Sequence, residues 1–245
     1  MTTASASLAA LDDFRPDSPN RPAARWYFIY VALKEAILTH AIEPGTKLPE
    51  DELGEIYSSS RTLVRSALQA LAHDRLVTLE LNRGAFVAKP TRLEAREIFE
   101  ARAIIEPTVA ALAAQAATPA DIERLRRHLE EEHVALHEGR NGEAVDLSGK
   151  FHVAIAEIAH QTVLTEFVRS LCSRSSLIVA LYWRRRDAMC ESHAHHALVD
   201  AIAANSPQDA REIMSSHLVD LLSGLDLSDR PPEPKKLTDI LRRPA

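Results

Sequence analysis

Glycine, cysteine and aromatic side chains are scarce in this chain of 245 residues. Only 7 glycines occur, and aromatic residues make up 5% of the sequence. Few glycines beside many Ala, Leu, Glu and Arg residues favour helix over sheet. The two cysteines, Cys172 and Cys190, do not suggest a disulfide framework. The composition therefore predicts a mainly helical protein that disulfide bonds do not hold together.

Long apolar runs are also missing. No run approaches the ~20 residues that a helix needs to span a bilayer. The first residues, MTTASASLAALDDF, do not combine a basic start with an apolar block, so we expect no signal peptide. These features predict a cytoplasmic location, no membrane partner and a disordered leader over residues 1–23.

Charge is spread unevenly along the chain. The net charge of −6 argues weakly against a nucleic-acid partner. Residues 21–90 are close to neutral, however, whereas residues 91–230 are acidic. A near-neutral segment attached to an acidic one indicates two tasks, and a basic patch within the first segment can still meet phosphate.

Residues 24–90 have the pattern of three short helices and a hairpin. We expect helices over about 24–39, 50–57 and 61–73, with a turn at Pro44-Gly45 and Ser60 accepting a hydrogen bond from the first turn of the third helix. Apolar β-formers flank Asn82-Arg83-Gly84, which is typical of a hairpin. In the third helix, the i, i+3, i+4, i+7 spacing predicts a buried stripe of Val64, Ala67, Leu68 and Leu71. This order predicts a winged helix-turn-helix.

Arg61 and Arg65 lie off the apolar stripe, one turn apart, at the N-terminal end of the third helix. In a winged helix-turn-helix this end enters the major groove. There an arginine can pair with guanine O6 and N7 or grip phosphate. Lys47 can contact phosphate, and Arg83 at the wing tip can reach the minor groove or the backbone. The alternative for such exposed cations is the solvated face of a helix or turn.

Lys89-Pro90-Thr91 breaks the pattern and marks a domain boundary. Beyond it nearly everything reads as helix, and the final residues, 231–245, form a proline-rich, basic, flexible tail. We therefore expect a mainly α fold, in which a winged helix-turn-helix domain over 24–90 precedes an all-helical domain over 91–230. The predicted helices of the second domain cover 92–117, 119–138, 141–160, 162–187, 191–204 and 207–224.

Two long stretches resemble one family. PGTKLPEDELGEIYSSSRTLVRSALQALAHDRLVTLELNRGAFVA is similar to the DNA-binding domain of GntR-type bacterial transcription regulators. The helical remainder resembles the C-terminal ligand-binding (FCD) domain of the FadR subfamily. It carries R-x-x-x-E at Arg102 and Glu106, FHxxI from Phe151, HHALVDAI over 195–202, and His217-Leu218. Departures from the family pattern are Leu63 for a usual Pro, Arg75 for a Gly, and Ser58-Ser59 for Gly-Val.

The resemblance implies a homodimer that reads a palindromic operator in double-stranded DNA. It assigns Arg61 and Arg65 as the main DNA contacts, with Ser60 and Thr62 beside them. At the wing tip Gly84 joins Arg83 as an expected contact, and Lys47 completes the predicted DNA-binding set.

Three of the 11 histidines match the family's metal ligands. The resemblance implies that His152, His195 and His217 converge from different helices, and imidazole suits Zn, Ni and similar divalent ions. The family's fourth ligand is an Asp one helical turn before the first His, where this sequence has Ser148. Asp146 lies six residues before His152, which places it on a different side of the helix.

Two arrangements remain open for this second domain. Three histidines and waters can hold a metal with open positions, to which an organic acid binds directly. Otherwise the metal is lost, and the effector binds neutral histidines and Arg102 in a pocket beside Ser148. Arg102 can meet an effector carboxylate, or it can form an i,i+4 ion pair with Glu106.

The leading hypothesis is a ligand-responsive transcription regulator, a repressor that a small carboxylate metabolite releases from its operator or modulates there. One alternative is a metal-dependent hydrolase with three histidine ligands. The sequence contains no HExxH, however, and an enzyme would leave the winged helix without a purpose, so we expect no enzyme. The other alternative is a DNA-binding protein that needs no effector.

Overall fold

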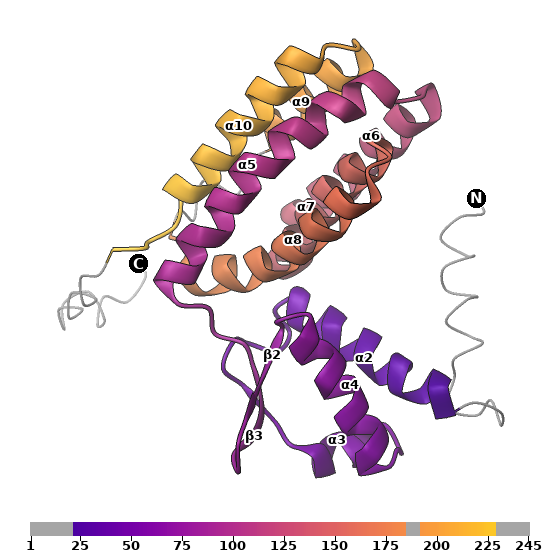
Figure 1. Cartoon of the computed structure of the whole chain (residues 1–245), viewed down its shortest axis with the longest axis vertical. Helices are drawn as coiled ribbons and strands as arrows, with labels where there is room; N and C mark the ends of the chain where they lie inside the picture. The colour runs from indigo at the N-terminus through magenta and orange to yellow at the C-terminus, as the bar shows by residue number, and fades with distance from the viewer. Residues whose placement is uncertain (1–21, 185–191, 229–245) are drawn as a thin grey trace, which may run out of the picture.

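The structure is a computed structural model that describes residues 22–184 and 192–228. These residues form two lobes, one small and one elongated, joined by a short linker (Figure 1). The expected tail and nearly all of the expected leader lie outside the described residues. Across the described ranges, no helix is long and apolar enough to cross a membrane.

The N-terminal lobe confirms the predicted winged helix-turn-helix. Its core is continuous from α2 to α4: the predicted stripe of Val64, Ala67, Leu68 and Leu71 is buried, and it packs with Ile29, Leu33 and Ile37. The elements follow one another as α2 (Pro22–Leu38), β1 (Lys47–Leu48), α3 (Glu50–Ile56), α4 (Arg61–His73), β2 (Val77–Glu80) and β3 (Gly84–Val87).

The wing is a three-stranded antiparallel sheet in the order β1-β3-β2. The hairpin β2–β3 turns at the predicted residues, where Asn82 and Gly84 have φ of 61° and 99°. Such positive φ angles suit Gly and Asn. The sequence predicted only a turn before Pro49, but Lys47 and Leu48 also pair with Phe86 and Ala85. A strand of two residues has no periodicity that could reveal it.

The C-terminal lobe is the predicted all-helical bundle. In it α5 runs beside α10, and α7 runs beside α8 (Figure 1). Pro119 and Pro207 begin their helices as expected, but α8 ends at Tyr182, before the predicted 187. The bounds are α5 (Arg92–Ala116), α6 (Pro119–His137), α7 (Asn141–Ile158), α8 (Thr162–Tyr182), α9 (Ser192–Ala203) and α10 (Pro207–Ser223).

The two lobes share a packed joint between the end of α2 and the helices α7 and α8. Leu177 of α8 is fully buried within the core of the N-terminal lobe. Nε2 of His40 lies 3.0 Å from both the carbonyl and the hydroxyl oxygen of Ser176, and that hydroxyl donates to the carbonyl of Leu38 at 2.9 Å. The N-terminal lobe is therefore held by α8, and the end of α2 also contacts α7, the helix that carries His152.

Candidate DNA-binding face and metal centre

The seven residues predicted to contact DNA are all exposed. Four of them, Ser60 to Thr62 and Arg65, belong to the N-terminal end of α4, and the others lie on β1 and at the wing tip. A Cβ built on Gly84 would lie 3.9 Å from Cε of Lys47, so β1 and the wing tip are neighbours. This end of the lobe points away from the helical bundle (Figure 1).

The side chain of Ser60 does not play the capping role that the sequence predicts. Ser60 is the N-cap residue of α4, as expected, but its side chain makes no capping hydrogen bond. Its hydroxyl is exposed, whereas Ser59 next to it donates to the carbonyl of Tyr57 at 3.0 Å. The capping hydrogen bond predicted for Ser60 is wrong, and α4 begins without side-chain help.

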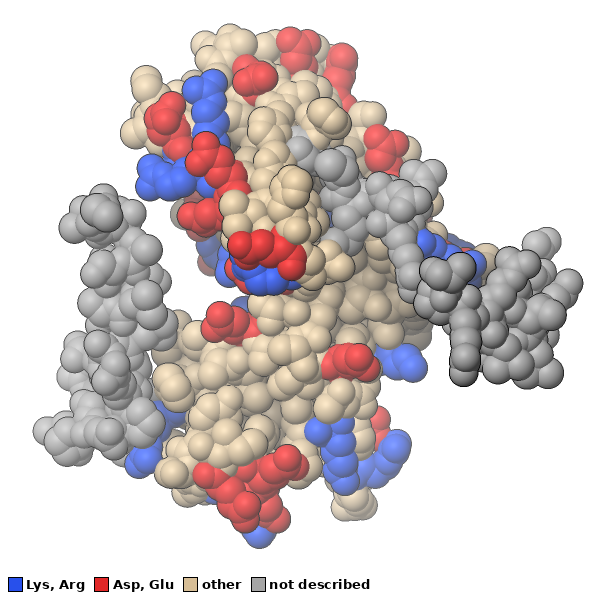
Figure 2. All heavy atoms as spheres, turned by 180° about the vertical axis from the view of Figure 1, so that it is seen from behind, with Lys and Arg blue, Asp and Glu red and all other residues tan. Residues whose placement is uncertain are grey.

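Acidic side chains of α3 form ion pairs with both of these arginines of α4. Glu50 accepts from Nε of Arg65 at 2.9 Å and from its Nη2 at 2.6 Å. Asp51 lies 2.5 Å from Nε of Arg61, and Arg83 pairs with Glu80 within the wing. In Figure 2 acidic and basic atoms lie together at the lower end of the molecule, where this lobe ends. The sequence does not predict these pairs, because Glu50 and Arg65 lie 15 residues apart and share no local pattern.

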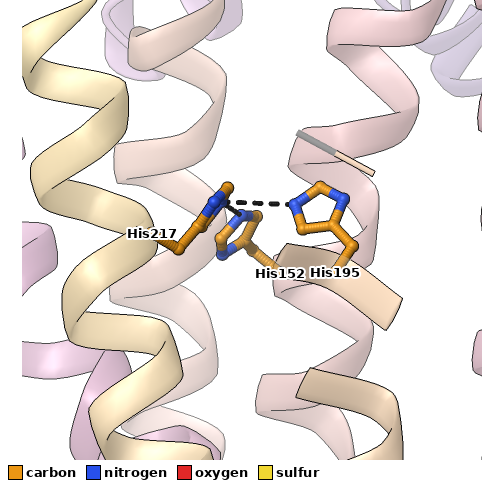
Figure 3. Close-up of side chains that lie close together, drawn as sticks. All are labelled: His152, His195 and His217. Carbon is orange, nitrogen blue, oxygen red and sulfur yellow. Dashed lines mark hydrogen bonds between the residues drawn. The ribbon is translucent and has the colours of Figure 1, made fainter. Parts of the chain in front are cut away.

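Three histidines from three helices meet inside the bundle. His152 of α7, His195 of α9 and His217 of α10 are all buried. Nε2 of His217 lies 3.2 Å from Nε2 of His152 and 3.3 Å from Nε2 of His195 (Figure 3). Two nitrogens bound to one tetrahedral zinc at 2.0–2.1 Å are separated by about 3.4 Å. The spacing of the cluster therefore fits a metal ion, and one ligand atom from each residue lies within 4.8 Å of the others.

Buried carboxylates orient two of these rings from behind. Oε2 of Glu106 lies 2.6 Å from Nδ1 of His152, and Oε2 of Glu132 lies 3.1 Å from Nδ1 of His195. A carboxylate accepts from Nδ1–H, so the proton stays on Nδ1 and the Nε2 lone pair faces the cluster. Nothing in the sequence singled out Glu132, because it lies 63 residues from His195 and belongs to no motif.

Arg102 is paired inside the bundle. Its Nε donates to Oε1 of Glu106 at 2.5 Å, and both side chains are buried. Of the two roles that the sequence left open, the structure shows the i,i+4 ion pair; contact with an effector remains a prediction. The chain Arg102–Glu106–His152 thus connects a permanent cation to one ring of the cluster.

The surroundings set the charge of these groups. Burial alone would raise the pKa of Glu106, but Arg102 and His152 together lower it to about 2. Burial lowers the pKa of His152 and lowers that of His217 well below its ordinary value, and the neighbouring charges of the cluster lower the pKa of His217 further. Glu106 is therefore ionised, and His152 and His217 are neutral, which is the form of imidazole that binds a metal.

Ser148 lies on α7, half-buried, one turn before His152. It lines a small cavity of about 60 Å³ together with Glu132, Val179 and Trp183. Asp146 faces elsewhere, as its spacing predicts: it pairs with Lys150 at 2.6 Å and lines a different cavity beside Cys172. The donor set is thus three imidazoles, which suits Zn or Ni and leaves coordination positions for another ligand.

Known families and proteins match both lobes. Residues 27–87 match the family of bacterial regulatory proteins, gntR family, and residues 97–220 match the FCD domain. The HTH-type transcriptional regulator LutR of Bacillus subtilis is 27% identical over 208 residues, which cover 75% of this chain and 94% of LutR. The Uxu operon regulator of Haemophilus influenzae is 28% identical over 217 residues, 80% of each chain.

Solved structures share the same two-lobed architecture. A transcriptional regulator GntR from Rhodococcus sp. RHA1 superposes with a TM-score of 0.71 at 26% identity, over 82% of this chain and 97% of that one. Escherichia coli McbR/YncC, with a TM-score of 0.72 at 21% identity over 81% and 95%, shows the fold alone. The curated relatives are transcriptional regulators and not enzymes. With its gntR and FCD matches in sequence, the chain belongs to the GntR family of bacterial transcription regulators, in the FadR subfamily that carries an FCD domain.

Proposed function

We propose that this regulator binds a palindromic operator as a homodimer and represses transcription until a small carboxylate metabolite binds to its helical lobe. Residues 24–90 would form the DNA-binding domain and residues 91–230 the effector-binding and dimerisation domain. The names of two relatives support this reading: the HTH-type transcriptional repressor RspR of E. coli and the Uxu operon regulator of H. influenzae.

The observation that carries the effector half is the convergence of three Nε2 atoms in a buried centre. His152, His195 and His217 would hold a Zn or Ni ion, which would supply a cationic position for an effector carboxylate. Ser148 leaves that position without the negative charge of an Asp, so the centre favours an anionic ligand. The cavity beside Ser148 offers adjoining space, and Arg102 would act through Glu106 and His152.

The mechanism follows from the placement of α7. The first turn of this helix packs against the end of α2, and its second half carries His152. An effector that binds better to one position of α7 shifts the population toward that arrangement of the DNA-binding lobes. In a dimer this changes the distance between the two α4 helices, and therefore the fit to two half-sites about one helical turn apart.

Measuring the metal content of the protein tests the proposed effector site. Tag-free protein purified without chelator should carry about one Zn or Ni per chain, and His217→Ala should abolish it. Protein that stays metal-free after incubation with either ion would overturn the metal centre and leave the histidines to bind the effector directly.

Operator titration tests the DNA-binding half. We expect Arg65→Ala to weaken operator binding at fixed salt by about 1–3 kcal/mol. Gln69→Ala is the matched control, because Gln69 is exposed on the same helix one turn further from the N-terminal end. If Arg65→Ala and the wild-type protein bound the operator with equal affinity, α4 would not be part of the DNA interface.

A further inference from the structure

The two arginines of α4 are already held in place in the free protein. Glu50 binds Arg65 through two parallel hydrogen bonds, at 2.9 Å and 2.6 Å, and Asp51 lies 2.5 Å from Nε of Arg61. The hydrogen bonds from Arg65 lower the pKa of Glu50, so this carboxylate is ionised at neutral pH. Glu50 and Asp51 belong to the first turn of α3, and Arg61 and Arg65 lie one turn apart at the N-terminal end of α4.

The contact with Glu50 fixes which edge of Arg65 faces outward. It uses Nε and Nη2, which leaves Nη1 and the second N–H of Nη2 at the tip of the guanidinium group. Those two terminal nitrogens form the fork that an arginine presents to guanine O6 and N7. The side chain of Glu50 is half as exposed as that of Arg65, 30% against 60%, so the guanidinium group is the more accessible partner of the pair.

We propose that Glu50 and Asp51 are specificity-determining residues of the DNA-binding face, which orient Arg65 and Arg61 toward guanine edges. This inference rests on the proposed role of α4 in operator binding. An unrestrained arginine turns easily to the nearest phosphate, and such a contact carries no sequence information. A fixed fork makes its two hydrogen bonds only where a guanine is present.

The negative charges of Glu50 and Asp51 also favour the operator over random DNA. Two carboxylates close to the DNA are repelled by phosphate on every sequence. That repulsion is offset only where both arginines find their bases, so the carboxylates weaken binding to random DNA more than binding to the operator. Both effects increase the ratio between operator and random affinity.

Charge-neutral variants test the proposal. The wild-type protein selects its preferred site from duplexes with a randomised core, and dissociation constants are then measured at one salt concentration on that site and on a random duplex of equal length. We expect Glu50→Gln to lower the ratio of random to operator dissociation constant about tenfold. Asp51→Asn should lower it in the same direction. Surface ion pairs contribute little to folding, so both variants should fold.

Glu55→Gln is the matched control, because it removes the same charge from an exposed position of α3. Glu55→Gln should tighten binding to both duplexes equally and leave the ratio unchanged.

In an Arg65→Ala background, Glu50→Gln should no longer change the ratio of random to operator dissociation constant. Equal tightening of Glu50→Gln on both duplexes would show that Glu50 acts by charge alone and would overturn the inference. A wild-type protein that prefers no site would instead refute sequence-specific operator binding, and the inference with it.

Discussion

At the scale of single residues, the histidine cluster depends on groups that do not belong to it. Glu106 and Glu132 each face the Nδ1 atom of one ring, and Arg102 keeps Glu106 ionised. Three polar rings and two carboxylates are costly to bury, and each needs a partner inside the bundle. Buried polar groups of this kind add little to stability, which supports the proposed role of the cluster in binding a metal.

The Glu132 contact predicts a graded effect on metal binding. Glu132→Gln keeps an acceptor near Nδ1 of His195 but removes the charge that makes the ring more basic. We expect zinc affinity to fall about tenfold, measured by competition with a chromophoric chelator. Glu131→Gln, an exposed neighbour on α6, should leave the affinity unchanged. Equal zinc affinities for Glu132→Gln and wild type would show that Glu132 does not orient His195.

Burial of His217 predicts that acid weakens the metal-free protein. Its pKa lies well below 6.5 in the folded state, so only the unfolded state takes up a proton as the pH falls through about 6.5. The free energy of unfolding should therefore decrease by about 1 kcal/mol between about pH 7.5 and about pH 5.5. Urea titrations with chelator present would measure it.

His217→Gln should remove that part of the pH dependence, whereas His137→Gln, at an exposed position, should retain it. A wild-type protein that is equally stable at both pH values would contradict the buried neutral state of His217.

At the scale of elements, the helices differ in how their first turns are satisfied. Thr91 and Glu94 form a complete capping box at the start of α5, and Thr118 and Asp121 form another at α6. α4 has no such help from Ser60. A hydroxyl that does not cap its own helix remains free to meet a phosphate, which suits the position of Ser60 on the DNA-binding face.

This contrast predicts different effects of the same type of substitution. Thr91→Ala removes the hydrogen bond to the Glu94 amide and should lower the free energy of unfolding by about 1 kcal/mol. Ser60→Ala removes no capping bond and should change stability by clearly less. Chemical denaturation of both variants measures the difference. Similar losses for the two would mean that Ser60 does cap α4 in solution.

The helices and strands also show how much of the structure the sequence could predict. Helices, hairpin and buried stripe follow from local periodicity and turn residues, so their positions agree with the structure within a few residues. The histidines come from motifs of the family. The pairs Glu50–Arg65 and Glu132–His195 join residues 15 and 63 positions apart, which no local pattern encodes. The two residues of β1 were missed for the opposite reason, because so short a strand has no pattern.

At the scale of the whole molecule, the joint between the lobes is the contact through which the proposed effector site would act on the DNA-binding lobe. α7 reaches from that joint to the histidine cluster, with Gly142 at one end and His152 near the other. The close approach of Thr39 to Gly142 leaves no space for a side chain: a Cβ there would lie 1.9 Å from the Thr39 carbonyl oxygen. In the proposed mechanism, this contact would transmit a shift of α7 to the end of α2.

Gly142→Ala should consequently loosen the joint. The added methyl group must push the end of α2 away from α7, and we expect a loss of about 1–3 kcal/mol in the free energy of unfolding. Hydrogen exchange should become faster for the amides of His40 and Ile42, whose bonds to Ile37 and Ala36 close the end of α2. Mass spectrometry of residues 36–42 would detect this change.

Gly149→Ala supplies a control of opposite sign on the same helix. Its Cβ would lie 3.7 Å from the nearest atom, Cβ of Cys172, so the methyl group fits. Replacing a glycine inside a helix by alanine should raise the free energy of unfolding by about 0.5–1 kcal/mol. If both variants gained stability and residues 36–42 exchanged at the wild-type rate, α2 and α7 would not be in contact in solution. The effector would then need another route to the DNA-binding lobe, because α7 would no longer link His152 to α2.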